Sequence, residues 1–367
     1  MKVAVFANSD WNLYNYRRPL ISVLLKKGYE VLALAPGCAY REDIEQLGCS
    51  FIEIKNIARK GTNPLKDLRL ILEIANIYRE QRIDLVLCFT IKPNIYGAFA
   101  SVFSSTKTIS TITGLGYSFL KGGVISSISN LLYKWAFKLS DSVVFQNRDD
   151  LELFIGMGIV NRKKTKLIRG SGINVNHFVS SLEVSKESFE LLFVGRLLFD
   201  KGVIELLEAF SIVHKSYDKV RLTLLGAIDK GNPASISEEV IKKYDLDYIR
   251  FVGHQSDVKF FIETADAVIL PSYREGLPRV LLEAMSMSKP IIATDVAGCR
   301  EVVRHNYNGY LVESQNADSL KDGIIRMIEL DFTERLRMGE IGREMVEMYF
   351  SDDVVTKSVL ELVENTI

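Results

Sequence analysis

Histidine, cysteine and long apolar runs are scarce in this chain of 367 residues, and each scarcity narrows the range of functions. The four cysteines show no C-x-x-C spacing, so neither a disulfide framework nor a structural zinc site is expected. No stretch approaches the roughly 20 apolar residues that span a bilayer, so any membrane contact should be peripheral. All four histidines follow residue 175, which leaves the first half without the usual acid–base side chain. A cytoplasmic protein is expected.

The net charge of zero conceals a difference between the two halves. Residues 1–175 hold 24 Lys and Arg against 14 Asp and Glu, a net charge of +10, so the remainder carries −10. A basic half favours an anionic ligand, such as a phosphate-bearing substrate or the cytoplasmic leaflet of a membrane. The alternative is that these cations are simply solvated. We expect no nucleic acid among the partners.

Short β-branched runs alternate with amphipathic helical segments along the chain, which is typical of parallel sheets with crossover helices. The polar stretch 174–188 predicts a linker between two doubly wound domains. We predict domains at 1–175 and 176–350, and a final helix at 351–367 that crosses back to the first domain. The predicted strands are 2–7, 30–35, 83–88, 107–112, 142–146 and 165–169 in the first domain, and 190–194, 220–225, 248–252, 267–270 and 290–294 in the second.

Ligands of open α/β sheets bind beyond the carboxyl ends of the strands. Two such domains should therefore face one another across a cleft that holds the chemistry.

The segment 266–285 carries the most informative pattern. A buried strand ends at Pro271, a loop contains Gly276 and Leu277, and a helix is predicted from about Pro278. The backbone N–H groups at such a helix start suit a phosphate. Glu275 precedes the helix and Glu283 lies within it, so these acids are candidates to bind sugar and ribose hydroxyls. The alternative is a first-turn acid that complements the helix dipole and an ordinary surface acid.

A second basic loop opens the second domain, in the sequence Gly195-Arg196-Leu197-Leu198-Phe199-Asp200-Lys201-Gly202. Arg196 and Lys201 are close enough in sequence to reach one diphosphate, the first as a planar fork and the second as a compact charge. The alternative is a surface loop that contains two cations by chance.

Together these two motifs resemble glycosyltransferase family 4 of the GT-B class, including its E-x7-E pattern. The resemblance implies two Rossmann-like domains and a retaining, metal-independent transferase that uses a UDP-sugar as co-substrate. It assigns Glu275 to the donor sugar, Glu283 to the ribose, and Arg196 and Lys201 to the diphosphate and its departure. Glu275, Arg196 and Lys201 are thus the predicted catalytic residues. Donor binding is expected to add Gly276, Leu277, Glu283 and, for the nucleobase, Val252 and His254.

Asp245-Leu246-Asp247 has the D-x-D spacing with which metal-dependent transferases hold Mn²⁺. It lies far in sequence from Arg196 and Lys201, so we interpret it as a solvated turn and predict no metal and no other cofactor.

The acceptor side departs from the family pattern, because the first domain has neither the usual Gly-Gly loop nor a histidine. Arg17, Arg18, Lys92 and Gly114 are the candidates to bind the acceptor. A bacterial subgroup that builds O-antigen, capsule and N-glycan precursors on undecaprenyl diphosphate is resembled in three motifs, Tyr14-x-x-Arg17-x-Pro19, Lys92-x-Asn94-x-x-Gly97 and Gly114-Leu115-Gly116. The resemblance implies a lipid-linked acceptor and peripheral contact with the inner membrane. The segment 131–138 could lie in the membrane interface, although a core helix whose lysines reach solvent is favoured.

The sequence therefore predicts a retaining transferase that moves an N-acetylhexosamine or a hexose from a UDP-sugar to a polyprenyl-diphosphate-linked acceptor. The alternative is a non-hydrolysing UDP-sugar 2-epimerase, which shares the two-domain architecture but usually relies on histidine. Donor, acceptor, linkage and oligomeric state stay open at this stage.

Overall fold

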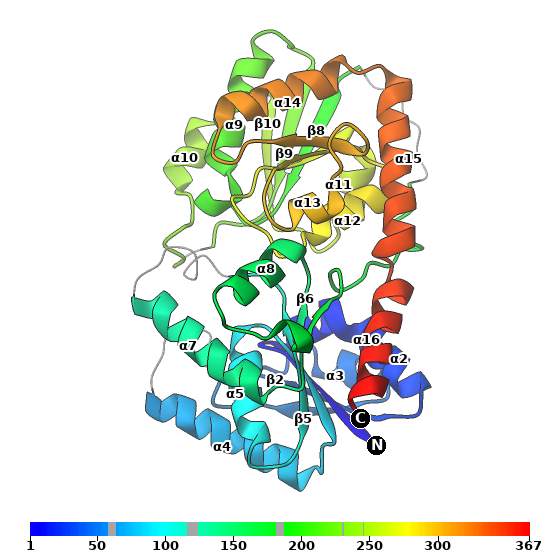
Figure 1. Cartoon of the computed structure of the whole chain (residues 1–367). Helices are drawn as coiled ribbons and strands as arrows, with labels where there is room; N and C mark the ends of the chain where they lie inside the picture. The colour runs from blue at the N-terminus through cyan, green and yellow to red at the C-terminus, as the bar shows by residue number, and fades with distance from the viewer. Residues whose placement is uncertain (58–63, 116–123, 181–186, 230, 245) are drawn as a thin grey trace. The chain divides into compact units, whose positions relative to one another are not determined.

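The structure is a computed structural model that describes residues 1–57, 64–115, 124–180, 187–229, 231–244 and 246–367. These residues form two compact units (Figure 1). Unit 1 comprises Met1–Gly172 and Asp352–Ile367, and unit 2 comprises Ile173–Ser351. The chain crosses between them after Gly172 and after Ser351, close to the predicted domain boundaries at residues 175 and 350.

Unit 1 contains a seven-stranded sheet in the order β3-β2-β1-β4-β5-β6-β7. Its strands are β1 (Lys2–Phe6), β2 (Glu30–Ala35), β3 (Ser50–Glu53), β4 (Leu85–Phe89), β5 (Lys107–Ile112), β6 (Ser142–Phe145) and β7 (Thr165–Leu167). Neighbouring strands run parallel, and Val3 of β1 pairs with Val31 on one side and with Leu85 on the other. The strand order reverses between β1 and β4, where ligands of such sheets bind.

Helices cover both faces of this sheet, because alternate residues of a strand point to opposite sides. Ala4 and Phe6 join one apolar cluster with α4, α5, α7 and α8, whereas Val3 and Val5 join another with α2, α3 and α16. The final helix packs against α2. The helices among the described residues of unit 1 are α1 (Asp10–Asn12), the π-helix η1 (Leu13–Arg17), α2 (Arg18–Lys26), α3 (Arg41–Glu45), α4 (Pro64–Glu80), α5 (Ile91–Ser101), α7 (Val124–Leu139), α8 (Arg148–Gly156), the short η2 (Arg162–Lys164) and α16 (Asp352–Thr366).

Unit 2 repeats this architecture with a six-stranded parallel sheet in the order β10-β9-β8-β11-β12-β13. The strands are β8 (Phe189–Val194), β9 (Val220–Leu225), β10 (Ile249–Gly253), β11 (Ala267–Leu270), β12 (Ile291–Thr294) and β13 (Gly309–Val312). Here the order reverses between β8 and β11. The prediction of two doubly wound α/β domains is confirmed.

The helices of unit 2 are η3 (Phe199–Lys201), α9 (Val203–His214), α10 (Glu238–Lys243), α11 (Lys259–Thr264), α12 (Arg279–Ser286), α13 (Cys299–Val302), α14 (Ala317–Glu329) and α15 (Phe332–Tyr349). One apolar cluster joins their inner faces to the sheet. Its members from α9 include Val203, Leu206, Phe210 and Val213, which follow the three-to-four-residue spacing of a helix that buries one side.

Several elements between residues 295 and 350 were not predicted. Strand β13 and helix α13 are only four residues long, and the glycines of α15 disfavour a helix in sequence. In the structure, a Cβ at Gly339 would lie 1.9 Å from the carbonyl oxygen of Ser288, so glycine allows α15 to approach that backbone closely. The start of the predicted linker also differs, since Phe178 is buried in unit 2. Residues 181–186 lie outside the described ranges.

Candidate functional site

The central candidates lie at the reversal point of the unit 2 sheet. Strands β8 and β11 are neighbours there, and their parallel pairing brings both carboxyl ends to one edge. The loop after β8 contains Arg196 and leads to Lys201, while the loop after β11 contains Glu275. Two motifs that are distant in the sequence therefore meet where open α/β sheets bind ligands.

Lys201 and Glu275 are in direct contact. Lys201 Nζ donates to Glu275 Oε1 at 2.5 Å, and the two side chains are 20% and 13% exposed. Ser272 Oγ donates to the same carboxylate oxygen at 2.7 Å. Two donors on Oε1 restrict the rotation of the carboxylate, so the acid is held in one orientation at the site. Sequence reasoning did not assign a role to Ser272.

Glycine permits the close approach of the loops around this pair. Gly202 adopts a positive φ of 67°, and a Cβ there would lie 2.1 Å from the carbonyl oxygen of Pro271. A Cβ at Gly298, in the loop after β12, would lie 2.7 Å from the carbonyl oxygens of both Glu275 and Gly276. The backbone around Glu275 is thus enclosed by two loops, and a larger residue in place of Gly202 or Gly298 would displace them.

Arg196 has a different partner. Its Nη1 donates to Asp229 Oδ2 at 2.9 Å, and Asn232 Nδ2 donates to the same oxygen at 3.0 Å. The Arg196 side chain is 57% exposed, which leaves it accessible to an anion from solvent. The two predicted diphosphate cations are therefore each paired with a carboxylate. The pairing of Arg196 with Asp229 was not predicted from the sequence.

Glu283 lies on α12, one turn beyond Arg279. Arg279 Nε donates to Glu283 Oε1 at 3.1 Å, and the Glu283 side chain is 13% exposed. Burial raises the pKa of the Glu283 carboxyl, and the Arg279 charge opposes this rise. Helix α12 begins at Arg279, and its N-cap residue is Pro278, which makes no side-chain cap hydrogen bond.

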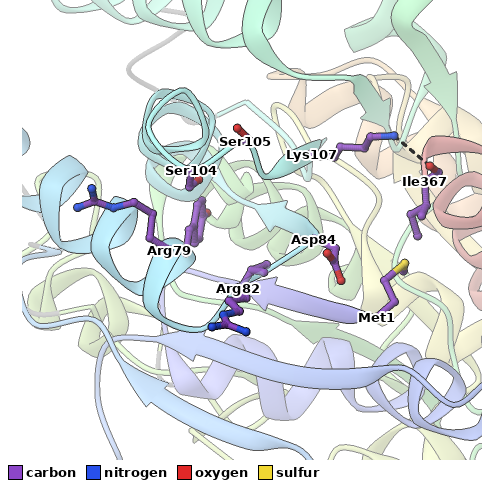
Figure 2. Close-up of a pocket in the computed structure, with 10 residues that line it drawn as sticks. Met1, Arg79, Arg82, Asp84, Ser104, Ser105, Lys107 and Ile367 are labelled. Atoms are coloured by element: carbon purple, nitrogen blue, oxygen red, sulfur yellow. Dashed lines mark hydrogen bonds between the residues drawn. The ribbon is translucent and has the colours of Figure 1, made fainter.

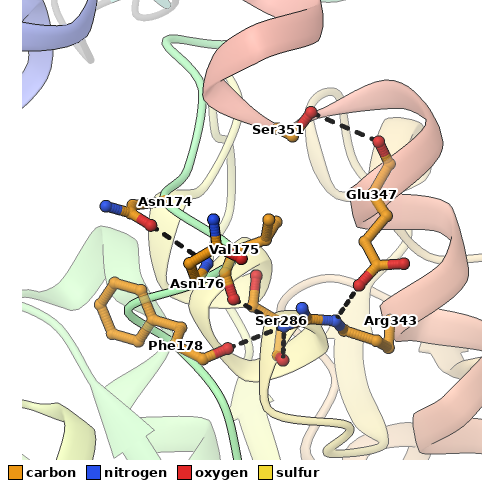
Figure 3. Close-up of polar contacts among 8 residues, drawn as sticks. All are labelled: Asn174, Val175, Asn176, Phe178, Ser286, Arg343, Glu347 and Ser351. Carbon is orange, nitrogen blue, oxygen red and sulfur yellow. Dashed lines mark hydrogen bonds and ion pairs between the residues drawn. The ribbon is translucent and has the colours of Figure 1, made fainter.

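The far end of α12 is anchored by an arginine of α15 (Figure 3). Arg343 Nη1 donates to the carbonyl oxygens of Ser286, Val175 and Phe178 at 2.5, 2.9 and 2.8 Å, and its Nε pairs with Glu347 at 2.6 Å. The same guanidinium thus joins the helix that carries Glu283 to the start of unit 2.

The nucleobase candidates lie at the end of β10, an edge strand that β9 separates from β8. Val252 is half-buried against the core, while His254 is exposed. The N–H of Gly226, after β9, donates to the carbonyl oxygen of Gly253 at 2.8 Å, which joins the ends of these two strands. No residue of this segment has a described contact with Lys201 or Glu275.

The acceptor candidates gather near the other reversal point, between β1 and β4 of unit 1. Arg17 is 5% exposed, and its guanidinium carbon lies 3.8 Å from the centre of the Phe89 ring. It lines a small cavity of about 20 Å³ together with Thr111 and Ser171. Arg18 is exposed and lies over Tyr14, so the two adjacent arginines have different surroundings.

Lys92 and Gly114 belong to neighbouring segments of unit 1. Lys92 is in the first turn of α5, and Gly114 follows β5 with a φ of 126°. Asn94 ties these segments together, because its side chain donates to the carbonyl oxygen of Thr111 at 2.8 Å and accepts from the Thr111 N–H at 3.1 Å. Gly116, the second glycine of the segment Gly114-Leu115-Gly116, lies outside the described residues.

Thr90, between β4 and α5, is a candidate that the sequence did not indicate. Its φ of 74° and ψ of 172° fall in a region that is essentially restricted to glycine. Its buried hydroxyl has no hydrogen-bond partner among the described residues. Strain and an unsatisfied polar atom coincide at functional sites more often than elsewhere, and Thr90 lies next to Phe89 at the reversal point.

Unit 1 also has a cavity of about 590 Å³ at the opposite end of its sheet (Figure 2). Met1, Asp84 and Lys107, which line it, lie at the amino ends of β1, β4 and β5. Lys107 Nζ donates to the carbonyl oxygens of Thr366 and Ile367 at 2.7 and 3.1 Å. This cavity is therefore remote from the strand ends where ligands of such sheets bind.

Within the described ranges, no three or more His, Cys, Asp and Glu side chains are grouped so as to hold a metal ion. Asp247 of the D-x-D segment is exposed, and Asp245 lies outside the described residues. In the same ranges we find no helix whose length and apolar character would let it cross a bilayer.

Comparison with protein families gives two matches that fall in the two units. A model described as Glycosyl transferases group 1 matches residues 176–345, and one described as Glycosyl transferase 4-like matches residues 2–147. The motif around Glu275 lies inside the first match and the acceptor candidates inside the second.

Two relatives are similar over most of the chain. The N,N'-diacetylbacillosaminyl-diphospho-undecaprenol alpha-1,3-N-acetylgalactosaminyltransferase of Campylobacter jejuni is 25% identical, covering 100% of this chain and 99% of its own length. The UDP-Gal:alpha-D-GlcNAc-diphosphoundecaprenol alpha-1,3-galactosyltransferase of Escherichia coli is 21% identical over 72% of this chain and 71% of its own length.

Solved structures share the fold. Anabaena HepE, determined in complex with UDP and glucose, superimposes with a TM-score of 0.80 at 20% identity, covering 100% of both chains. Sucrose-phosphate synthase from Thermosynechococcus elongatus has a TM-score of 0.83 at 19% identity, covering 100% of this chain and 98% of the other.

Proposed function

Because the chain belongs to the glycosyltransferases of the group 1 and 4-like families, we propose that it moves a sugar from a UDP-sugar to a polyprenyl-diphosphate-linked acceptor. The observation that carries this proposal is the Lys201–Glu275 pair at the reversal point of the unit 2 sheet. The lipid-linked acceptor is supported by the relatives from Campylobacter jejuni and Escherichia coli, whose names specify diphospho-undecaprenol acceptors.

Unit 2 binds the donor in this proposal. Lys201 exchanges its contact with Glu275 for the donor diphosphate, and the exposed Arg196 leaves Asp229 for the same group. Their charges stabilise the negative charge that develops on UDP as it departs, which is the role a metal serves in other transferases. Glu275, released from Lys201 but still held by Ser272, accepts hydrogen bonds from the sugar hydroxyls.

The transfer step retains the anomeric configuration. The acceptor hydroxyl oxygen forms a bond to the anomeric carbon on the face from which UDP departs, the bond from that carbon to the diphosphate oxygen breaks, and the hydroxyl proton moves to a β-phosphate oxygen. No enzymic nucleophile is required. Unit 1 supplies the acceptor side through Arg17, Arg18, Lys92 and Gly114, and the protein works at the cytoplasmic face of the inner membrane.

The test is mass spectrometry of the products from a panel of UDP-sugars with a short polyprenyl-diphosphate sugar, with NMR to assign the new anomeric bond. We expect one donor to be transferred with retention, and equally well in EDTA. Glu275→Gln should abolish most of the transfer, whereas Glu313→Gln, at an exposed acid of unit 2, should not. Transfer with inversion, or loss of activity in EDTA, would contradict the mechanism.

The 2-epimerase alternative is not favoured, because both matching family models are those of glycosyltransferases. Incubation of UDP-GlcNAc without acceptor separates the two activities, since an epimerase would interconvert the sugar and a transferase would not.

A further inference from the structure

Helix α7 of unit 1 has two apolar faces, and within the described residues only one of them packs on the unit. Tyr133, Ala136 and Phe137 are buried, and the rings of Tyr133 and Phe137 lie 5.6 and 6.1 Å from the ring of Phe154 on α8. This face accounts for the position of α7 in the fold. The sequence prediction that residues 131–138 form a core helix thus describes one side of α7 only.

The opposite side carries an apolar stripe that faces solvent. Ile128, Leu131, Trp135 and Leu139 are between 42% and 56% exposed, and their spacing of three or four residues aligns them along one side of the helix. We call these four residues the α7 stripe. An exposed alignment of large apolar side chains on one helix marks an interaction surface rather than the scattered apolar residues of an ordinary surface.

Lysines border the α7 stripe. Lys134 and Lys138 are exposed, and Lys138 Nζ lies 4.5 Å from the centre of the Trp135 ring. Residues 124–139 contain no Asp or Glu, in a half of the chain whose net charge is +10. Lysine stems can lie along apolar surface while their charges remain in water, and tryptophan is favoured where a membrane meets water.

We propose that the α7 stripe docks unit 1 onto the surface of an anionic bilayer. The charges select this occupant, because anionic headgroups attract the two lysines. In a symmetric contact with a second copy of α7, the lysines would face like charges instead. The biological role of this docking rests on the proposed function, because the acceptor of that reaction is anchored in the same bilayer. Docking would confine enzyme and acceptor to one surface.

The chain contains only two tryptophans, so Trp135 can report its own environment. In a full-length Trp11→Phe protein, Trp135 is the remaining tryptophan. On addition of vesicles that contain phosphatidylglycerol, its emission should shift to the blue and be quenched by brominated acyl chains. If the protein co-sediments with the vesicles but the emission of Trp135 does not change, the proposal is overturned, because the protein then binds the vesicles through another surface.

Variants separate the apolar and the charged parts of the surface. Leu131→Ser with Trp135→Ser should weaken vesicle binding roughly tenfold or more, since half-exposed side chains of this size lose their burial in the interface. Lys134→Gln with Lys138→Gln should weaken binding to anionic vesicles roughly thirtyfold and leave the weak binding to phosphatidylcholine unchanged. The control is Phe260→Ser on α11, which removes an aromatic ring that is 63% exposed in unit 2.

Transfer assays distinguish this inference from the proposed function. The Leu131/Trp135 variant should lose transfer to undecaprenyl acceptors in vesicles but keep transfer to a short-chain, water-soluble acceptor, which also shows that it folds. If the wild type transfers to neither acceptor but binds vesicles through the stripe, the proposed function fails and the inference stands. If both binding and transfer in vesicles survive the substitutions, or if they abolish a dimer in solution instead, the inference is wrong.

Discussion

Replacement of Gly202 by alanine tests how the loop after β8 positions Lys201. Gly202 has a φ of 67°, and its missing Cβ would lie 2.1 Å from the carbonyl oxygen of Pro271. An L-residue in this left-handed conformation costs about 1 kcal/mol relative to glycine. The backbone contact adds about 1–3 kcal/mol, because an ordinary contact needs more than an ångström of additional separation. We therefore expect a total destabilisation of about 2–4 kcal/mol.

The displacement should also disturb the site, since Lys201 precedes the glycine and Ser272 follows the proline. Either shift would separate Lys201 Nζ from Glu275 Oε1, which are 2.5 Å apart. We expect weaker binding of UDP by isothermal titration calorimetry, together with a lower midpoint of chemical unfolding.

The matched control is Gly158→Ala in unit 1. Gly158 has a similar φ of 63°, but no atom lies within 4 Å of the Cβ position, so this variant should incur only the conformational cost. The difference between the two variants then measures the clash with Pro271. If Gly202→Ala is no less stable than Gly158→Ala and binds UDP as the wild type does, the tight packing around Lys201 does not position it.

Three further changes follow from the same structure. Thr90→Gly should relieve about 1–3 kcal/mol of backbone strain and so raise the midpoint of unfolding, while kcat/KM for the acceptor falls. A variant that is no more stable than the wild type would show that Thr90 is not strained. For Glu283, the raised pKa means that the folded state holds the proton more tightly than the unfolded state, so stability decreases as pH rises from the unfolded pKa through the folded one. Glu283→Gln should remove that slope from a series of unfolding curves, and an unchanged slope would assign it to another group. Arg343→Met removes the donor to three backbone carbonyls and should destabilise unit 2 by about 3 kcal/mol or more, whereas Arg343→Lys should recover part of the loss. Calorimetry of both variants measures these changes in stability. A Met variant as stable as the wild type would contradict the anchoring role.

The motif around Glu275 shows how far local sequence information reaches. The apolar run before Pro271, the glycine in the loop and the helix that follows are local features, and the structure has them as β11, a loop and α12. The spacing of Glu275 and Glu283 was equally readable. Local pattern also predicted most strands within one or two residues, because each buried strand is a compact β-branched run.

Strand β13 and helix α15 did not follow from the local sequence pattern. Strand β13 has four residues, and α15 contains Gly339 where a helix former would be expected. Its close contact with Ser288 explains that glycine, but the contact partner lies 51 positions away along the chain.

The sequence by itself determined the two doubly wound domains and the candidate residues for the donor, because strand periodicity and loop motifs are properties of neighbouring residues. Only the tertiary structure decided which of them meet. Lys201 reaches Glu275 across 74 residues, Arg343 reaches Val175 across 168, and burial alone raises the pKa of Glu283. The two faces of α7 were likewise present in the sequence, but which face packs and which meets solvent depended on the position of α8. Contacts between distant segments follow from the order of strands in the sheets, which no local pattern contains.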